Sequence, residues 1–287
     1  MNIDVKIDRV TISGTILKTF DVLFNSLEGT RWMVSGDDSF RLYRELENGT
    51  NELVAGLYTN PYQAASWRLD TSNHLEADDL EHIQRMISLM ENPHFTRIDI
   101  AFDIVNGYKP VMKHKIYRFN ASQSEFSISD NSSLEITGRG RSIETIYSGK
   151  RKSDKMIRYY NKLVEQKSRR KFVSEDIVSW ERLELQLRGK KPLEWIECAE
   201  EMLSFFKMPN LQKIENAQDR AMIYALDNHL VEYQELSKGT RAKFRKLIKD
   251  NCGFDTEYAE LCLKVLNKEK ENLENELNDF LVLVNLK

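Results

Sequence analysis

The chain has 287 residues, 41% of them hydrophobic and 30% charged, which is enough to bury the core of one large domain or two small ones. Its formal net charge of −3 excludes a chain that is basic throughout, so any nucleic-acid contact has to come from local basic patches. Three scattered cysteines without a Cys-x-x-Cys pair, a start unlike a signal peptide and no apolar run of about 18 residues indicate a soluble cytoplasmic protein with no cysteine metal site, disulfide framework or membrane partner.

The first ninety residues are predicted to form several strands and one helix. Partial alternation of β-branched and aliphatic residues over residues 5–17 predicts one or two strands, and shorter strands are expected at residues 31–34, 52–58 and 67–70. Asn48 and Gly49 form a dipeptide typical of a hairpin turn. Apolar residues at helical spacing predict a helix over residues 76–91, which Ser72 or Asn73 could cap.

The rest of the chain changes from strands to helices. Strict alternation predicts strands over residues 95–104 and 180–188, a polar stretch around 120–141 is expected to be a loop, and two strands at 144–147 and 156–162 are joined by a basic turn. From about residue 193 the pattern is helical. We therefore expect an α+β fold of duplicated, mostly antiparallel sheet units with a helical C-terminal region, divided into residues 1–190 and 191–287.

Two of the predicted strands resemble each other. Residues 95–102 and 180–187 both run aromatic, any residue, Arg, aliphatic, acid, aliphatic, small or polar, apolar. Because side chains alternate across a strand, Arg97 and Asp99 in one copy, and Arg182 and Glu184 in the other, are expected on a polar face that points away from the core. The match suggests a duplicated unit with a functional sheet surface, although two amphipathic strands can also resemble each other by chance.

The basic turn and the strand after it contain the residues best suited to chemistry on a phosphate. Four cations in the turn suit contacts with a DNA backbone: Lys150, Arg151, Lys152 and Lys155. Alternation then puts Arg158, Tyr160 and Lys162 on one open face of the strand and Tyr159 on the other. Two flanking cations would neutralise a phosphate and favour the phenolate of a tyrosine, whose pKa is ordinarily about 10. Spacing alone also fits a solvated strand with basic side chains.

The same segment resembles the signature of the Rep-trans family, the replication initiators of Gram-positive rolling-circle plasmids of the staphylococcal type. That signature runs Tyr-x-Gly-x-Arg-x-Ser-Asp-(Arg/Lys)-hydrophobic-Ile-Arg-x-Tyr-Asn-Lys, and residues 147–162 read YSGKRKSDKMIRYYNK. The family's Phe-Thr-Arg-aliphatic-Asp strand matches residues 95–103, and its Trp-Arg-aliphatic-Glu strand matches residues 180–184 with one residue inserted. The similarity covers nearly the whole chain.

The resemblance implies a plasmid initiator that nicks the origin strand, with Tyr160 as the nucleophile and Arg158 and Lys162 beside it. It implies a 5′-phosphotyrosine link, strand transfer, a curved sheet that carries the active site, and a divalent metal. The implied partners are origin DNA, which we expect to form a hairpin at the double-strand origin, a second copy of the chain in a homodimer, and a host helicase. Residues 1–190 would then be the nicking core, and residues 191–287 the region of DNA recognition and dimer contact.

The expected metal is Mg²⁺ or Mn²⁺, because the five histidines include no His-hydrophobic-His pair and carboxylates suit hard cations. Asp99 and Glu184 are the first candidates for its ligands, since the repeat puts them at equivalent positions, and Asp103 shares the face of Asp99. Asp70 and Glu144 are possible as well. The open alternative is that Arg97–Asp99 or Arg182–Glu184 form ion pairs that hold no metal.

The C-terminal third includes a basic helix. Phe244, Leu247 and Ile248 form its apolar face, and the resemblance implies that origin recognition lies in this region. The DNA-binding candidates there are Lys238, Arg241, Lys243, Arg245, Lys246 and Lys249. A solvated amphipathic helix fits the same pattern. The last helix has an apolar stripe with Leu273, Leu277, Phe280, Leu281 and Val284, which could pack on the chain itself or on a second subunit.

Two other functions remain open at this stage. A relaxase of an integrative conjugative element would use the same chemistry on a different target site. A DNA-binding regulator without catalysis could use the same scaffold, although the presence of Tyr160 and of the carboxylates argues against it.

Overall fold

The computed structural model describes residues 1–36, 39–47, 49–60, 65–73, 75–107, 134–139, 142–203, 207–227, 230–254 and 259–282. The chain forms two compact units that interleave along the sequence. Unit 1 comprises Met1–Asp4, Asp103–Leu183 and Ala199–Leu266; unit 2 comprises Val5–Phe102, Glu184–Cys198 and Asn267–Lys287. The predicted division at residue 190 therefore differs from the division into compact units.

Ten strands in the described part of the chain form one sheet in the order β2-β3-β4-β5-β1-β6-β10-β9-β8-β7. Their bounds are β1 (Asn2–Thr15), β2 (Trp32–Val34), β3 (Ser39–Glu45), β4 (Asn51–Thr59), β5 (Ser66–Thr71), β6 (Glu91–Val105), β7 (Leu134–Arg139), β8 (Ser142–Ser148), β9 (Lys155–Asn161) and β10 (Trp180–Arg188). The pairs β1·β5, β2·β3, β3·β4, β4·β5, β7·β8 and β8·β9 are antiparallel. The predicted α+β class with a mostly antiparallel sheet is confirmed.

The helices are α1 (Phe20–Ser26), α2 (Ala77–Ile87), α3 (Lys162–Ser168), α4 (Trp195–Leu203), α5 (Ala217–Asp227), α6 (Lys238–Asp250) and α7 (Ala259–Phe280). Within the described residues, none of them has the length and apolar character needed to cross a lipid bilayer.

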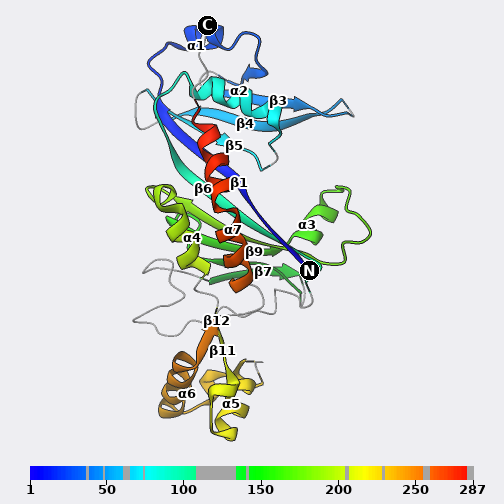
Figure 1. Cartoon of the computed structure of the whole chain (residues 1–287), viewed down its shortest axis with the longest axis vertical. Helices are drawn as coiled ribbons and strands as arrows, with labels where there is room; N and C mark the ends of the chain where they lie inside the picture. Colours follow the sequence, from blue (N-terminus) through cyan, green and yellow to red (C-terminus); the bar gives the residue numbers. More distant parts are fainter. Residues whose placement is uncertain are drawn as a thin grey trace. The chain divides into compact units, whose positions relative to one another are not determined.

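Unit 2 is built on antiparallel hairpins. β3 and β4 pair antiparallel, and Gly49, from the hairpin turn predicted between them, has a φ of 76°, a left-handed conformation that favours glycine. Asn48, the other residue of that predicted turn, lies outside the described residues. The helix predicted at residues 76–91 is α2, but Glu76 and not Ser72 or Asn73 precedes it, with its backbone N–H donating to the buried Asp79. Arg31 and Arg44 pair with Asp79, so α2 is tied to the strands beside it (Figure 1).

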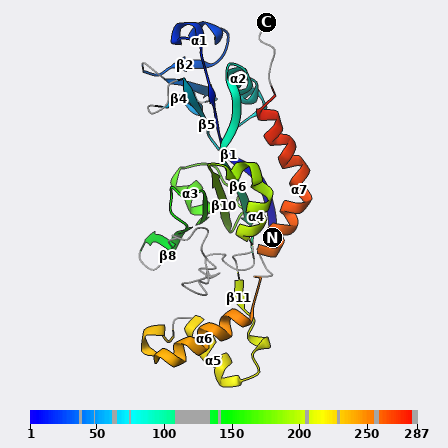
Figure 2. The ribbon, with the colours of Figure 1, turned by 90° about the vertical axis from the view of Figure 1, so that its left-hand side faces the viewer.

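Unit 1 contains β7, β8 and β9 and a small helical cluster. α5 and α6 lie side by side (Figure 2) and enclose the apolar side chains of Ile214, Ile223, Leu226, Phe244 and Ile248. The two short strands β11 (Lys207–Pro209) and β12 (Cys252–Phe254) pair antiparallel at the ends of this segment. The predicted apolar face of the basic helix is therefore the face that α6 buries.

The two strands of the repeat, β6 and β10, are neighbours in the sheet. The backbone bonds from Gly189 to Thr96 and from Asn106 to Ser179 make the pair antiparallel. The predicted core side is confirmed, since Ile98, Ile100 and Phe102 on β6, and Leu183, Leu185 and Leu187 on β10, are buried. The predicted exposed polar side is wrong: Asp99, Asp103, Arg182, Glu184 and Gln186 are buried as well. Both faces of these strands are covered, as in the centre of a large sheet.

Two further predictions need correction. Residues 134–139, expected to belong to a loop, form β7, which pairs antiparallel with the next strand, β8, with a register shift between Thr137 and Gly138. The polar composition and the glycines of this stretch hid the strand. Lys162, expected on the strand, is the first residue of α3, because Asn161 ends β9 and caps the helix.

Three further residues named in the sequence analysis have no described side chain. Val284 lies outside the described residues, and so do the side chains of Glu144 and Lys249.

Candidate functional site

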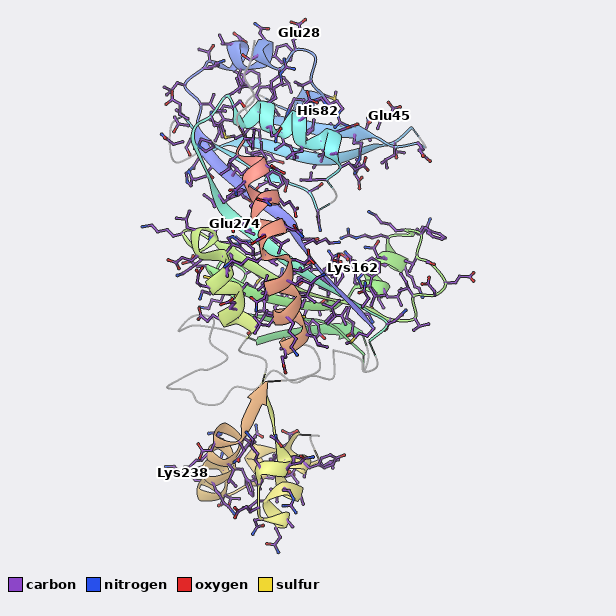
Figure 3. All side chains as sticks on the ribbon, viewed as in Figure 1. Glu28, Glu45, His82, Lys162, Lys238 and Glu274 are labelled. Carbon is purple, nitrogen blue, oxygen red and sulfur yellow. The ribbon has the colours of Figure 1, made fainter. Side chains whose placement is uncertain are left out.

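A sharp change from strand to helix creates the centre of the candidate site in unit 1. β9 ends at Asn161, whose side-chain oxygen accepts a hydrogen bond of 3.0 Å from the backbone N–H of Val164. Asparagine is among the best residues for this capping position. The cap starts α3 at Lys162 (Figure 3), so the lysine that follows the strand is turned back toward Tyr160 and does not continue along the strand.

The structure brings the predicted tyrosine and its two cations together. The guanidinium carbon of Arg158 lies 4.0 Å from the centroid of the Tyr160 ring, within the range of a cation–π contact. The Lys162 ammonium lies 3.4 Å from the Tyr160 hydroxyl oxygen and 5.6 Å from the ring centroid. The predicted open face is wrong, however, because the side chain of Tyr160 is only 2% exposed. The phenol is thus enclosed, but its surroundings carry positive charge.

The environment of the Lys162 side chain is energetically unfavourable for a positive charge. It is 1% exposed and stands at the first position of a helix, where the peptide dipoles disfavour positive charge. Its ammonium donates to Glu165, which also pairs with Arg169 at 2.9 Å. Burial raises the pKa of Glu165, but the hydrogen bond and charge of Lys162 and the charges of Arg169 and Arg158 outweigh it, so the pKa lies below its usual value.

Glu165 was missed by sequence reasoning. It lies three residues after Lys162, a spacing at which two side chains meet on a helix, but α3 was not predicted and the spacing had no meaning on a strand. Glu165 gives the buried ammonium a carboxylate partner. The site is therefore a chain of contacts from carboxylate to ammonium to phenol.

The basic turn between β8 and β9 is exposed on the same unit. Gly149 has a φ of 95°, which explains why the turn needs a glycine there. Lys150, Arg151 and Lys152 are exposed, and the Arg151 guanidinium lies 5.0 Å from the centroid of the Tyr147 ring. These three residues can reach a DNA backbone.

Lys155, the fourth predicted phosphate contact, has a different environment. Its side chain is buried, and its ammonium contacts Glu201 of α4. Tyr159, the competitor of Tyr160, is 1% exposed, so burial does not separate the two tyrosines, whereas the cation contacts with Arg158 and Lys162 involve Tyr160.

The predicted metal ligands are held by other side chains. Asp103 accepts two bonds of 2.7 Å from Arg182 and one of 2.8 Å from the Trp180 indole. Asp99 accepts two bonds from Arg97 and a third of 3.2 Å from Gln186. The alternative ion pair Arg97–Asp99 is therefore present, while Arg182 pairs with Asp103.

The guanidinium contacts of Asp99 and Asp103 occupy carboxylate oxygens that a divalent metal would need. Glu184 is buried in unit 2 with Asp99, whereas Asp103 belongs to unit 1. Among the residues whose side chains are described, no three His, Cys, Asp or Glu come together as metal ligands. With Asp99 and Asp103 engaged by guanidinium groups, the described carboxylates do not fit a metal site.

The basic helix α6 presents part of its predicted cationic surface. Ser237 caps it by accepting from the backbone N–H of Thr240. Lys238 (Figure 3), Arg245 and Lys246 are exposed and Arg241 is half-buried. Lys243 is exposed too, but it pairs with Asp219 at 2.6 Å. Three cations on one short helix remain well placed for phosphate contacts.

Residues 93–213 match the family model described as "Replication initiation factor". This part of the chain is similar to the Rep-trans family. This region includes Tyr160, Arg158 and Lys162, the three carboxylates predicted to bind metal, and the basic turn, whereas α6 lies beyond its end. The predicted resemblance to the Rep-trans family is confirmed.

Curated relatives agree with this assignment. Two proteins of Staphylococcus aureus named "Replication initiation protein" are 33% identical over 172 residues and 30% identical over 192 residues. The alignments cover 58% and 65% of this chain, and 48% and 55% of the relatives. The chain thus spans about half the length of the curated relatives it matches.

A solved rolling circle replication initiator protein from Geobacillus stearothermophilus matches 79% of this chain and 85% of its own, with a TM-score of 0.38 and 15% identity.

Proposed function

We propose that this protein initiates rolling-circle replication of a plasmid by nicking one strand of the origin, with Tyr160 as the nucleophile. The supporting observation is the pair of cations on its phenol: the Lys162 ammonium at the hydroxyl and the Arg158 guanidinium over the ring, inside the segment that is similar to the Rep-trans family. A phosphodiester is an anion, and a phenolate is the form of tyrosine that attacks it. Both need positive charge at this position.

The roles of the residues follow from these contacts. Lys162 stabilises the negative charge on the phenol oxygen, and Glu165 holds the ammonium in place. Arg158 is placed to neutralise charge on the phosphate as the transition state forms. The tyrosine oxygen forms a bond to phosphorus, and the bond from phosphorus to the 3′ oxygen breaks. The departing oxygen takes up a proton, which leaves a free 3′-hydroxyl and a 5′-phosphotyrosine link.

The burial of Tyr160 adds a condition to this proposal. A side chain with 2% exposure reaches a phosphodiester only if its neighbours move when DNA binds. The exposed turn with Lys150, Arg151 and Lys152 is the described part of β8–β9 that can meet DNA first. Nicking is therefore expected to require a conformational step after DNA binding.

A divalent metal, the host helicase and a homodimer also belong to this proposal, since the family resemblance implies them. The described carboxylates do not form a metal site, so no step above depends on one. The stripe on α7 does not provide the dimer surface, because Leu273, Leu277 and Phe280 are buried within the chain.

The test is nicking of a supercoiled plasmid that carries the DNA flanking the coding sequence. The parent protein should convert it to an open circle, Tyr160→Phe should abolish conversion, and Tyr159→Phe, the matched control, should retain it. Mass spectrometry of the covalent product should find the nucleotide on Tyr160. Equal nicking by the parent and Tyr160→Phe would show that the nucleophile is misassigned, and specific binding without nicking by the parent would indicate a regulator.

A further inference from the structure

Unit 2 contains a pocket lined by four arginines. Four neighbouring strands contribute one each: Arg68 from β5, Arg9 from β1, Arg97 from β6 and Arg188 from β10. The pocket has a volume of about 330 Å³, and its remaining lining residues are Thr11, Asp70 and Thr96. Alternation placed Arg188 on the polar side of its strand, and Arg68 lay on another expected strand, but nothing in the sequence connected these two residues with Arg9, because the three are far apart along the chain.

Two of these arginines face each other across a strand pair. The backbone bond from Gly189 to Thr96 places Arg97 directly opposite Arg188 on the antiparallel strands β6 and β10. Like charges in that position destabilise a sheet. The pKa of Arg188 is lowered, first by burial and then by the positive charge of Arg97. The repulsion between Arg97 and Arg188 destabilises the protein when the pocket is empty, and a bound anion would relieve it.

The acids nearby offset only part of this charge. Asp70 lies 3.0 Å from Arg68 and 4.0 Å from Arg9, and it also accepts from the Thr11 hydroxyl. Asp99 engages Arg97 from the strand that carries both residues. The carboxylate of Glu184 acts on Arg97 through its charge only. Three carboxylates thus oppose four guanidinium groups, and only one of them, Asp70, lines the pocket.

Some of the donors in the pocket lack an anionic partner. Arg188 donates its Nε to Gln186 at 2.9 Å, and none of the described carboxylates forms an ion pair with it. The Nε of Arg9 is buried and has no hydrogen-bond partner among the described residues. The side chains of Arg9 and Arg68 are 36% and 56% exposed, so the pocket opens to solvent on their side.

We propose that this pocket binds a phosphodiester group of the DNA backbone, at a site distinct from the residues around Tyr160. Guanidinium groups match phosphate oxygens with paired, directional donors, and a phosphate would satisfy Arg188 and Arg9 while relieving the Arg97–Arg188 repulsion. A backbone phosphate fits better than free phosphate because the pocket is open at Arg9 and Arg68, which lets a strand pass. The choice of DNA as occupant rests on the proposed function.

The test is fluorescence anisotropy with the full chain and a labelled duplex carrying the flanking DNA, titrated at several KCl concentrations. The double variant Arg68→Gln/Arg188→Gln should bind roughly 10- to 100-fold more weakly, the range expected for lost charged hydrogen bonds. The slope of log K against log salt should fall by about 1, one phosphate contact. Arg41→Gln, on β3 of the same unit, is the control for charge loss and should bind like the parent.

The DNA-binding measurements distinguish the proposed phosphate pocket from the proposed nicking site at Tyr160. Tyr160→Phe should bind DNA like the parent, so a failure of the nicking proposal leaves this measurement unaffected. Arg188→Lys, which keeps the charge, should recover part of the affinity, and circular dichroism should show that each variant is folded. Unchanged DNA affinity and salt slope in the double variant would overturn the inference. So would a loss confined to the binding of inorganic phosphate, which would make the pocket a site for a free anion.

Discussion

Asp103 and Arg182 form a buried ion pair with two parallel bonds, in which the Nε and one terminal nitrogen of Arg182 each lie 2.7 Å from an Asp103 oxygen. The side chain of Arg182 is 2% exposed and that of Asp103 is 8% exposed. The Trp180 indole donates a further bond to the carboxylate. This pair joins β6 and β10, the two strands of the repeat. The Asp103 carboxylate therefore has a structural role in the sheet.

Asp103→Ala should destabilise the protein strongly. It leaves the Arg182 guanidinium buried without its carboxylate, which typically costs about 3–5 kcal/mol. The double variant Asp103→Leu/Arg182→Met should be more stable than the single one, because no isolated charge remains. Urea unfolding of the three proteins measures both differences. If the single variant loses less than about 1 kcal/mol, the pair does not hold the strands together.

Lys162→Met should slow nicking while leaving DNA affinity nearly unchanged. Removing one preorganised donor from a developing negative charge typically costs about 10²–10³-fold in rate. Methionine fills similar volume in a position that is 1% exposed, so the fold should persist. Single-turnover rates over a pH series measure the effect, and the variant should need higher pH than the parent. A rate equal to that of the parent would remove Lys162 from the mechanism.

Glu165→Gln should change how stability depends on pH. The folded protein lowers the pKa of Glu165, so its carboxylate stabilises the fold above the ordinary value of about 4.3, and this contribution is lost as the pH falls through the folded pKa. The parent should therefore exceed the variant in free energy of unfolding at pH 7, and the difference should shrink toward pH 3. A difference that does not vary with pH would mean that Glu165 has no such coupling to Lys162.

The sequence predicted the strands whose patterns are local, and it predicted the group around Tyr160. Alternation identified β6 and β10 and put Tyr160 between its two cations, and the resemblance to the family's Tyr-Asn-Lys pattern singled out Tyr160 as the nucleophile. Alternation says which side chains share a face but not what covers that face. The burial of Tyr160 and the covered polar side of β6 and β10 therefore could not be foreseen.

Contacts between strands that are distant in the sequence could not be predicted either. A single sequence contains no register, so the pairing of Asp103 with Arg182 and of Arg97 with Arg188 appears only when β6 and β10 lie side by side. The same carboxylates looked like metal ligands when their partners were unknown. The short helix α3 was hidden because Lys162 continues the strand alternation.

Phe280→Ala should destabilise the monomer and leave any self-association unchanged. The Phe280 ring is 4% exposed and packs edge-to-face on Phe95, with the ring centroids 6.4 Å apart. Truncating a buried phenylalanine typically costs about 3–5 kcal/mol. Thermal unfolding combined with sedimentation measures both properties. A variant that is as stable as the parent but no longer self-associates would place this stripe in a subunit interface.

Replacing the exposed cations of α6 should weaken origin recognition without unfolding the helix. The triple variant Lys238→Gln/Arg245→Gln/Lys246→Gln leaves the buried face with Phe244 and Ile248 intact. If α6 reads the origin, affinity for the flanking DNA should fall more than affinity for unrelated DNA, because base contacts specify whereas phosphate contacts do not. The two affinities are compared at the same salt concentration. An equal loss on both DNAs would make α6 a backbone contact and place sequence reading elsewhere in the chain.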